Sequence, residues 1–207
     1  MMQNRWLNKT ANSKKSPLPI SGAWGRRSLR LVLLPLLCAL VCFGGSNPAE
    51  SHSAQEYEVK AVFLYNFAKF VEWSPGALGS PDEPLIIAVI GKDPFGRALD
   101  LIKDKTVGGR TILIRRFAGI EDLGKCHILF IASSDREEVS HIVRATKNLS
   151  ILTVGELKGM GATGVVINFI IENSKVRFEI NPDAANRAGL KISSHLLKLA
   201  RIIRENN

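Results

Sequence analysis

The chain has 207 residues and a formal net charge of +9, but the charge is unevenly distributed. Seven of the 28 Lys and Arg residues precede Gln55 against one of the 19 acidic residues, so the remainder carries a net charge of only +3. This balance is ordinary for a globular domain and excludes strongly basic proteins that bind nucleic acid through charge, so no nucleic-acid partner is expected.

The amino-terminal segment has the pattern of a secretory signal. Residues 31–43 form an apolar run of thirteen residues that follows a basic stretch. A membrane-spanning helix needs roughly 20 such residues, so the run is too short to span and indicates a cleaved leader. Cleavage is expected near residues 44–46 or near Ser53, and we favour Ser53 because ordered patterning begins at Gln55.

These features predict a signal peptide and leader over residues 1–54, a single domain over residues 55–207, and a periplasmic location. Two of the three cysteines, Cys38 and Cys42, belong to the leader. The exported domain keeps Cys126 alone, so it cannot form an intramolecular disulfide, and we interpret the thiol as a small buried hydrophobe.

Residues 56–73 contain neither Gly nor Pro and predict a helix that is apolar around most of its circumference. One broad face is expected to carry Val59, Val62, Phe63, Phe67, Phe70 and Trp73. A helix of this kind lies either inside a core or in a subunit interface, and one face of a domain does not cover it. We therefore predict a homodimer, with Phe67, Phe70 and Trp73 at the interface.

Strand and helix patterns alternate through the rest of the chain. Apolar runs predict buried strands, and capping residues predict the helices between them. The predicted fold class is α/β, with a mainly parallel sheet flanked by helices in flavodoxin-like or receiver-like layering, an antiparallel carboxy-terminal hairpin and carboxy-terminal helices. The expected strands are residues 85–90, 110–117, 127–132, 151–154, 165–171 and 176–180, and the expected helices begin at Asp93, Ser134, Asn181 and Ser193 or Ser194.

The sequence offers little for catalysis. Residues 91–96 form a turn between a strand and a helix but lack the Lys-Ser/Thr pair of a phosphate-binding loop. Cys126 and His127 are neighbours on a predicted strand, so their side chains point to opposite faces and cannot act on each other. The other histidines lie far apart in the sequence and suggest no metal cluster. We expect no catalytic residue, cofactor or metal.

Residues 176–191 encode a strand and a tight corner. Val176, Phe178 and Ile180 alternate with Arg177 and Glu179, which predicts one buried face and one solvent-exposed face. Polar residues around the corner form either a solvated face with local ion pairs, which we favour, or an edge that binds a partner or an anion. The candidate binding residues are Arg177, Glu179, Asn181, Arg187 and Lys191.

Several segments of the predicted domain share the pattern of one known family. They are YEVKAVFLYNFAKFVEW (57–73), IIAVIGKDPFG (86–96), GRTILIRR (109–116), CHILFI (126–131), ILTVGE (151–156) and RFEINPDAANRAGLKISSHLLKLAR (177–201). These segments cover nearly the whole exported part, and the last one is the most specific. In these segments the chain resembles the YfiR-like family of exported α/β proteins.

The resemblance implies a non-catalytic periplasmic regulator. Such a protein binds the periplasmic sensing domain of an inner-membrane diguanylate cyclase of the YfiN type and keeps cytoplasmic cyclic di-GMP low. Family members with redox roles carry paired cysteines, so the single Cys126 departs from that pattern. Two alternatives remain open: a small-molecule-binding sensor for another membrane receptor, and an exported enzyme with a pocket at the carboxyl ends of the strands.

Overall fold

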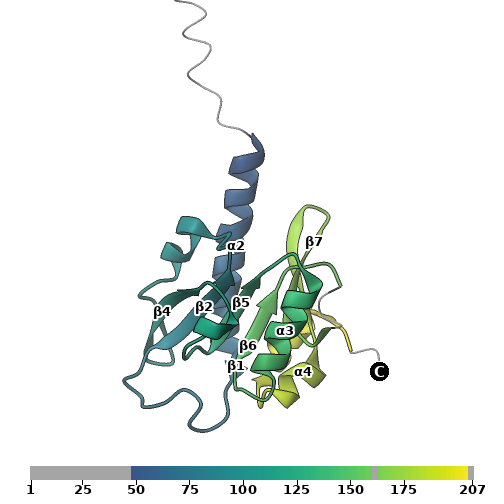
Figure 1. Cartoon of the computed structure of the whole chain (residues 1–207). Coiled ribbons are helices and arrows are strands. Elements are labelled where there is room, and N and C mark those ends of the chain that lie inside the picture. The colour runs from purple at the N-terminus through teal and green to yellow at the C-terminus, as the bar shows by residue number, and fades with distance from the viewer. Residues whose placement is uncertain (1–47, 160–162, 205–207) are drawn as a thin grey trace, which may run out of the picture. The chain divides into compact units, whose positions relative to one another are not determined.

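The computed structural model describes residues 48–159 and 163–204, which lie in one compact unit, Asn47–Asn207 (Figure 1). The apolar run at 31–43 and the cleavage site considered at 44–46 lie outside the described residues, so the leader stays a prediction. Within the described part, no helix combines the length and the apolar character needed to cross a membrane.

A sheet of eight strands forms the centre of the unit, in the order β10-β8-β7-β6-β5-β2-β4-β3. Pairing is antiparallel between β7 and β8 and between β3 and β4, and parallel between all other neighbours. The predicted α/β class and the hairpin are therefore confirmed. The strands are β2 (Leu85–Gly91), β3 (Thr106–Val107), β4 (Arg110–Phe117), β5 (Ile128–Ala132), β6 (Leu152–Gly155), β7 (Ile167–Glu172), β8 (Lys175–Ile180) and β10 (Arg201–Ile202).

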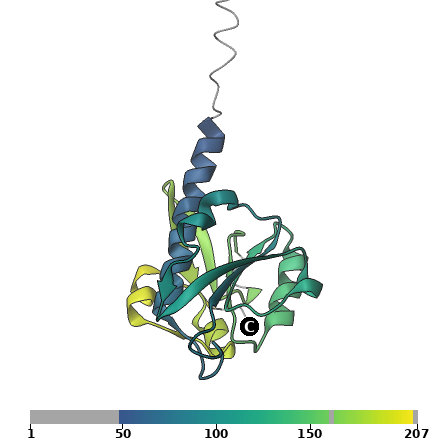
Figure 2. The same ribbon diagram turned by 90° about the vertical axis from the view of Figure 1, so that its left-hand side faces the viewer.

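Helices cover both faces of this sheet (Figures 1 and 2). On one face, α2 (Pro48–Phe70), the 3-10 helix η1 (Gly96–Leu101), α4 (Pro182–Arg187) and α5 (Ser194–Leu199) pack over one core, and on the other face α3 (Arg136–Thr146) packs over a second. Alternate apolar residues of β2 enter the two cores, as expected for a strand buried on both sides.

The connections explain this layering. From β2 the chain crosses to β4 through η1 on the α2 face, and from β5 it crosses to β6 through α3 on the opposite face. The two crossovers run in opposite directions along the sheet, so both can be right-handed only if they lie on opposite faces. The point where the direction reverses lies between β2 and β5.

Helix α2 differs from its prediction in its bounds and in which of its residues face the core. It ends at Phe70, and the chain continues as β1 (Val71–Glu72), which pairs with β9 (Lys191–Ile192). Val59 and Val62 are exposed, whereas Leu64 and Phe67 are fully buried. The predicted face was therefore wrong for both valines, because a helix that is apolar nearly all round has no clear polar side to set its orientation.

The carboxy-terminal corner forms largely as predicted. Asn181 caps α4 through a hydrogen bond of 3.0 Å from the Ala184 N–H, and Gly189 follows the helix with φ +65°. Ser193 caps α5, but that helix ends at Leu199, which is exposed. The next residues form β10, the outer neighbour of β8, so β8 is not the edge strand.

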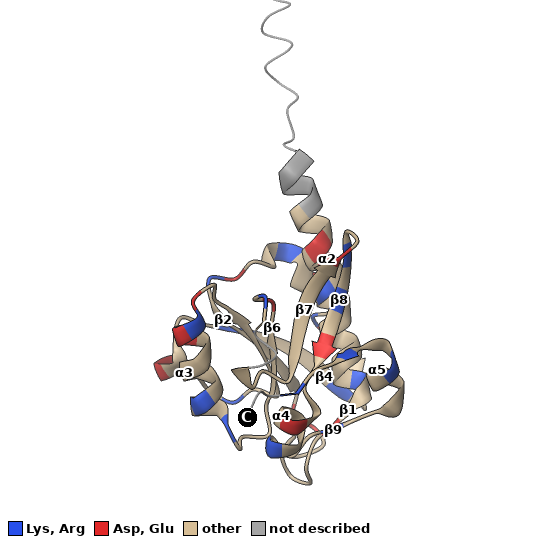
Figure 3. Cartoon of the chain, turned by 90° about the vertical axis from the view of Figure 1, so that its right-hand side faces the viewer, with Lys and Arg blue, Asp and Glu red and all other residues tan. Residues whose placement is uncertain are grey.

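The helix predicted at Asp93 begins later than expected. The Asp93 carboxylate accepts a hydrogen bond of 2.8 Å from the Phe95 N–H, and η1 begins only at Gly96. The 3-10 helix η2 (Ile120–Asp122) lies between β4 and β5. Helix α3 is capped by Asp135, one residue after the predicted Ser134. On the face shown in Figure 3, basic and acidic residues are interspersed.

Candidate functional site

A large cavity lined by described residues lies at the carboxyl ends of the parallel strands. It has a volume of about 780 Å³, and its walls include the residues that follow β2, β5 and β6, the middle of α2, and β7. It therefore spans the point between β2 and β5 where the crossover direction reverses. Open α/β sheets place ligands in this position.

A buried lysine lies against this cavity. Lys60 of α2 is only 3% exposed, and its Nζ lies 2.5 Å from Glu56 Oε1 and 2.6 Å from Glu156 Oε2. A buried ammonium group needs such partners, because an unpaired charge inside a protein is strongly unfavourable. Glu156 directly follows β6, so the cluster fixes α2 to the strand ends.

Tyr57 completes the cluster. Its hydroxyl donates a hydrogen bond of 3.0 Å to Glu156 Oε1, and its ring lies 4.4 Å from Lys60 Nζ. Burial, reinforced by the negative charge of Glu156, raises the pKa of Tyr57 well above its ordinary value. The phenol is therefore a fixed donor that holds Glu156, and it is not available as a base.

The sequence contains one signal of this cluster. Lys60 precedes Leu64 and Phe67 by four and seven residues, so helical spacing places it on the buried side of α2. Its partner Glu156 lies 96 residues further along the chain, and no local pattern connects the two.

The corner residues nominated from the sequence do not form one exposed surface. Arg177 is exposed, whereas Glu179 is only 6% exposed and accepts hydrogen bonds from Asn168 Nδ2, at 3.1 Å, and Arg201 Nε, at 3.0 Å. The predicted solvent-exposed position of Glu179 was wrong, because β10 brings Arg201 alongside it.

The other three nominated residues lie in three different settings. Asn181 is fully buried as the cap of α4. Arg187 lines a smaller cavity of about 270 Å³ between α3 and α4, and Lys191 forms an exposed ion pair of 3.3 Å with Glu72. A binding role for these residues stays a prediction.

The three aromatic residues nominated for an interface also separate. Phe67 is fully buried in its own chain, with ring centroids 5.7 Å from Phe169 and 5.1 Å from Phe178. Phe70 is half-buried against the ring of His195, and Trp73 is half-buried. Phe67 is therefore a core residue that the fold leaves inaccessible to a second copy.

Cys126 and His127 have separate structural roles. Burial raises the pKa of the Cys126 thiol to about 12, so it is a poor nucleophile. His127 Nδ1 accepts a hydrogen bond of 2.9 Å from the Ile86 N–H, and burial, with nearby Lys125 and Arg110, lowers the pKa of His127. Among the described residues, no group of three or more His, Cys, Asp or Glu side chains could hold a metal ion.

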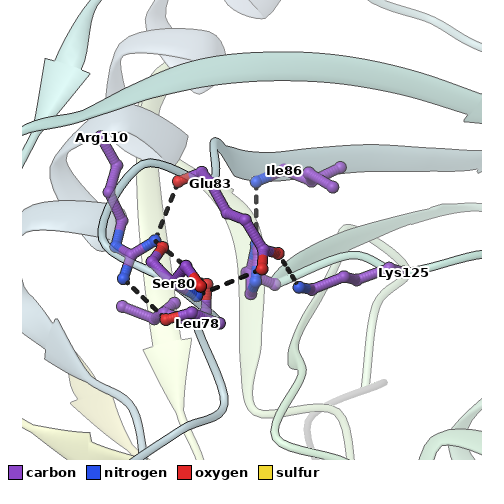
Figure 4. A network of polar contacts seen from close by, with 8 residues as sticks. Leu78, Ser80, Glu83, Ile86, Arg110 and Lys125 are labelled. Carbon is purple, nitrogen blue, oxygen red and sulfur yellow. Dashed lines mark hydrogen bonds and ion pairs between the residues drawn. The ribbon is translucent and has the colours of Figure 1, made fainter.

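A second polar network, shown in Figure 4, positions the loop before β2. The guanidinium of Arg110 on β4 donates hydrogen bonds to four backbone carbonyls of this loop, those of Leu78, Gly79, Ser80 and Glu83. The Glu83 carboxylate also pairs with Lys125. The network satisfies backbone groups and offers no reactive pair, so we regard it as structural.

Comparison with known families agrees with the pattern of the sequence. Residues 57–201 match the model of a family described as YfiR/HmsC-like. The match begins at Tyr57 and ends at Arg201, so it includes Tyr57, Lys60 and Glu156 of the buried cluster, the strand ends and the carboxy-terminal corner. The chain therefore belongs to the YfiR/HmsC-like family.

Proposed function

We propose that this protein is a non-catalytic periplasmic regulator that binds and restrains a membrane signalling protein, a diguanylate cyclase, and so lowers cyclic di-GMP. The observation that carries the proposal is family membership over residues 57–201. The proposed periplasmic location rests on the secretory pattern before residue 55.

The mechanism that we propose is selective binding. A bound protein can shift the conformation of its receptor only by binding one conformation more tightly than the other. To change a receptor from 99% active to 99% inactive, the preference must reach about 5.5 kcal/mol. The buried thiol of Cys126 and the hydrogen-bonded imidazole of His127 support a role without catalysis.

The export step can be tested directly. We expect the mature protein to be found in the periplasmic fraction with its amino terminus near Ser53, since the apolar run is too short to remain as an anchor. Mass spectrometry of fractionated protein measures this. A start near residues 46–47 would support the other cleavage site and keep the whole of α2, whereas an intact chain in the cytoplasm would contradict export.

The regulatory proposal predicts that deleting the gene raises cyclic di-GMP. Complementation with the wild-type gene and with a Cys126→Ser variant should both restore the low level, because the proposed restraint needs no thiol chemistry. If deletion leaves cyclic di-GMP unchanged and removes an exported hydrolytic or redox activity, the protein is an enzyme and this proposal is wrong.

A second candidate function is a small-molecule-binding sensor for another membrane receptor. The cavity at the strand ends favours it, because its volume of about 780 Å³ lies within the range of ligand sites and it contains a built polar cluster around Lys60. The same cavity is the place where the enzyme alternative would put its substrate.

A further inference from the structure

We propose that the strand-end cavity binds a small organic anion, a carboxylate or phosphate attached to an apolar or aromatic body. The inference rests on the second candidate function and names its ligand class. It is independent of whether the receptor is a cyclase.

The charged groups at the cavity hold one another in place, and the carboxylates of Glu56, Glu156 and Glu179 outnumber the cations of Lys60 and Arg201 by one. Lys60 is shared between Glu56 and Glu156, and Arg201, which also lines the cavity, pairs with Glu179. These ion pairs hold the charged groups of the cavity in fixed positions.

Three further charged side chains line the cavity. Lys92 follows β2 and Lys158 follows β6, and neither side chain forms an ion pair among the described residues. Glu172, the last residue of β7, also lines the cavity. An anionic group can pair with either of the two lysines without first breaking another ion pair.

The apolar part of the cavity lining suits an apolar body. Leu157 and Ile170 are half-buried, Phe169 is buried, and Ile171 is 55% exposed although it belongs to a core-forming strand. Binding of an apolar group here would remove the exposed Ile171 side chain from water, which stabilises a complex in proportion to the area covered. The anionic and apolar preferences thus lie in one cavity.

Three naphthalene compounds of similar shape test the ligand class: naphthalene-2-carboxylate, the neutral naphthalene-2-carboxamide and the cationic naphthalen-2-ylmethanamine. Isothermal titration calorimetry with the purified protein should show that the acid binds about tenfold more tightly than the amide, a difference of about 1.4 kcal/mol, and that salt weakens only this preference. Preference for the amine, equal affinity for all three compounds, or absence of binding would each overturn the proposal.

Substitutions locate the site. Lys92→Ala and Lys158→Ala should each reduce the preference for the acid several-fold, and Ile171→Ser should weaken the acid and the amide alike. Lys147→Ala is the matched control, because this exposed lysine lines the smaller cavity. If Lys147→Ala alone weakens the acid, the ligand occupies the smaller cavity and the assignment is wrong. All four side chains are exposed and lie on loops, a strand end or a helix end, so the variants are expected to fold.

The two proposals fail independently. If calorimetry detects no binding, the ligand proposal is wrong. The rise of cyclic di-GMP on deletion still tests the proposed restraint of a cyclase. If deletion does not change cyclic di-GMP, a cyclase is not the partner, but the ligand proposal still stands.

Discussion

At the scale of single residues, buried polar groups show what the sequence pattern does not. Lys60, His127 and Glu179 each occupy a position where an apolar residue or an exposed charge would be expected. Each is held by specific hydrogen bonds or ion pairs, as buried polar groups generally are. Their titration and replacement therefore give measurable effects.

His127 predicts a loss of stability in mild acid. Its folded-state pKa lies below the ordinary value of 6.5, because burial and nearby cations oppose protonation. The unfolded chain therefore takes up the proton first, so the contribution of His127 is complete above about pH 6.5 and is lost as the pH falls from there towards the folded pKa.

Denaturant titrations between pH 7.5 and 5 measure this effect, with a slope of up to about 1.4 kcal/mol per pH unit. His127→Asn keeps an acceptor for the Ile86 N–H and should flatten the slope. The control, His141→Asn, alters an exposed histidine and should leave it unchanged. An equal slope in His127→Asn and wild type would show that His127 does not cause the acid sensitivity.

Substitutions of Phe178 and Arg177 test which face of β8 is buried. Phe178 is 4% exposed and packs against Phe67 and Phe63, whereas Arg177 is exposed. Phe178→Ala should lower the free energy of unfolding by about 3–5 kcal/mol, and Arg177→Ala by less than about 0.5 kcal/mol. Chemical denaturation of both variants checks the order, and the reverse order would contradict the packing.

At the scale of elements, long apolar runs could be predicted and short edge elements could not. β2 and β4 appear close to their expected bounds, because their patterns are local. β10 has two residues and exists only because it pairs with β8, so no local signal marks it. The direction faced by α2 depends on which strands it meets, and the Lys60–Glu156 pair depends on the sheet order. These features follow from tertiary structure.

The loop before β2 should depend on one side chain. Arg110 donates to the carbonyls of Leu78, Gly79, Ser80 and Glu83. Arg110→Ala leaves these carbonyls without their donor, so we expect faster hydrogen–deuterium exchange across residues 76–84. Arg115→Ala, an exposed position on the same strand, serves as the control. Equal protection in both variants would mean that the loop is ordered by other contacts.

At the scale of the molecule, the residues that form the cores and the residues that line the larger cavity lie in different parts of the fold. The two cores lie between the helices and the two faces of the sheet, while the larger cavity lies at the carboxyl ends of the strands. Residues at this end, such as Lys92 and Lys158, can change without disturbing either core. The fold class could be predicted because alternating patterns encode it, whereas the cavity could not, since it is built from six separate parts of the chain.

The predicted homodimer would use a smaller apolar surface of α2 than the sequence pattern indicates. With Leu64 and Phe67 buried, the exposed large apolar residues of α2 with described side chains are Val59 and Val62, at 41% and 45% exposure. A stable dimer buries about 800 Å² on each partner, which two valines cannot supply alone, so the interface would need the adjoining length of α2 as well. We therefore expect a dimer that dissociates at micromolar concentration.

Sedimentation equilibrium measures the association. Val62→Asp should shift the protein to monomer, because a charge placed in an apolar interface loses its hydration without a partner. Leu149→Asp alters another exposed apolar residue, distant in sequence at the end of the α3 region, and should leave the equilibrium unchanged. A wild-type protein that stays monomeric at every concentration would mean that the apolar circumference of α2 serves only the core, which already accounts for Leu64 and Phe67.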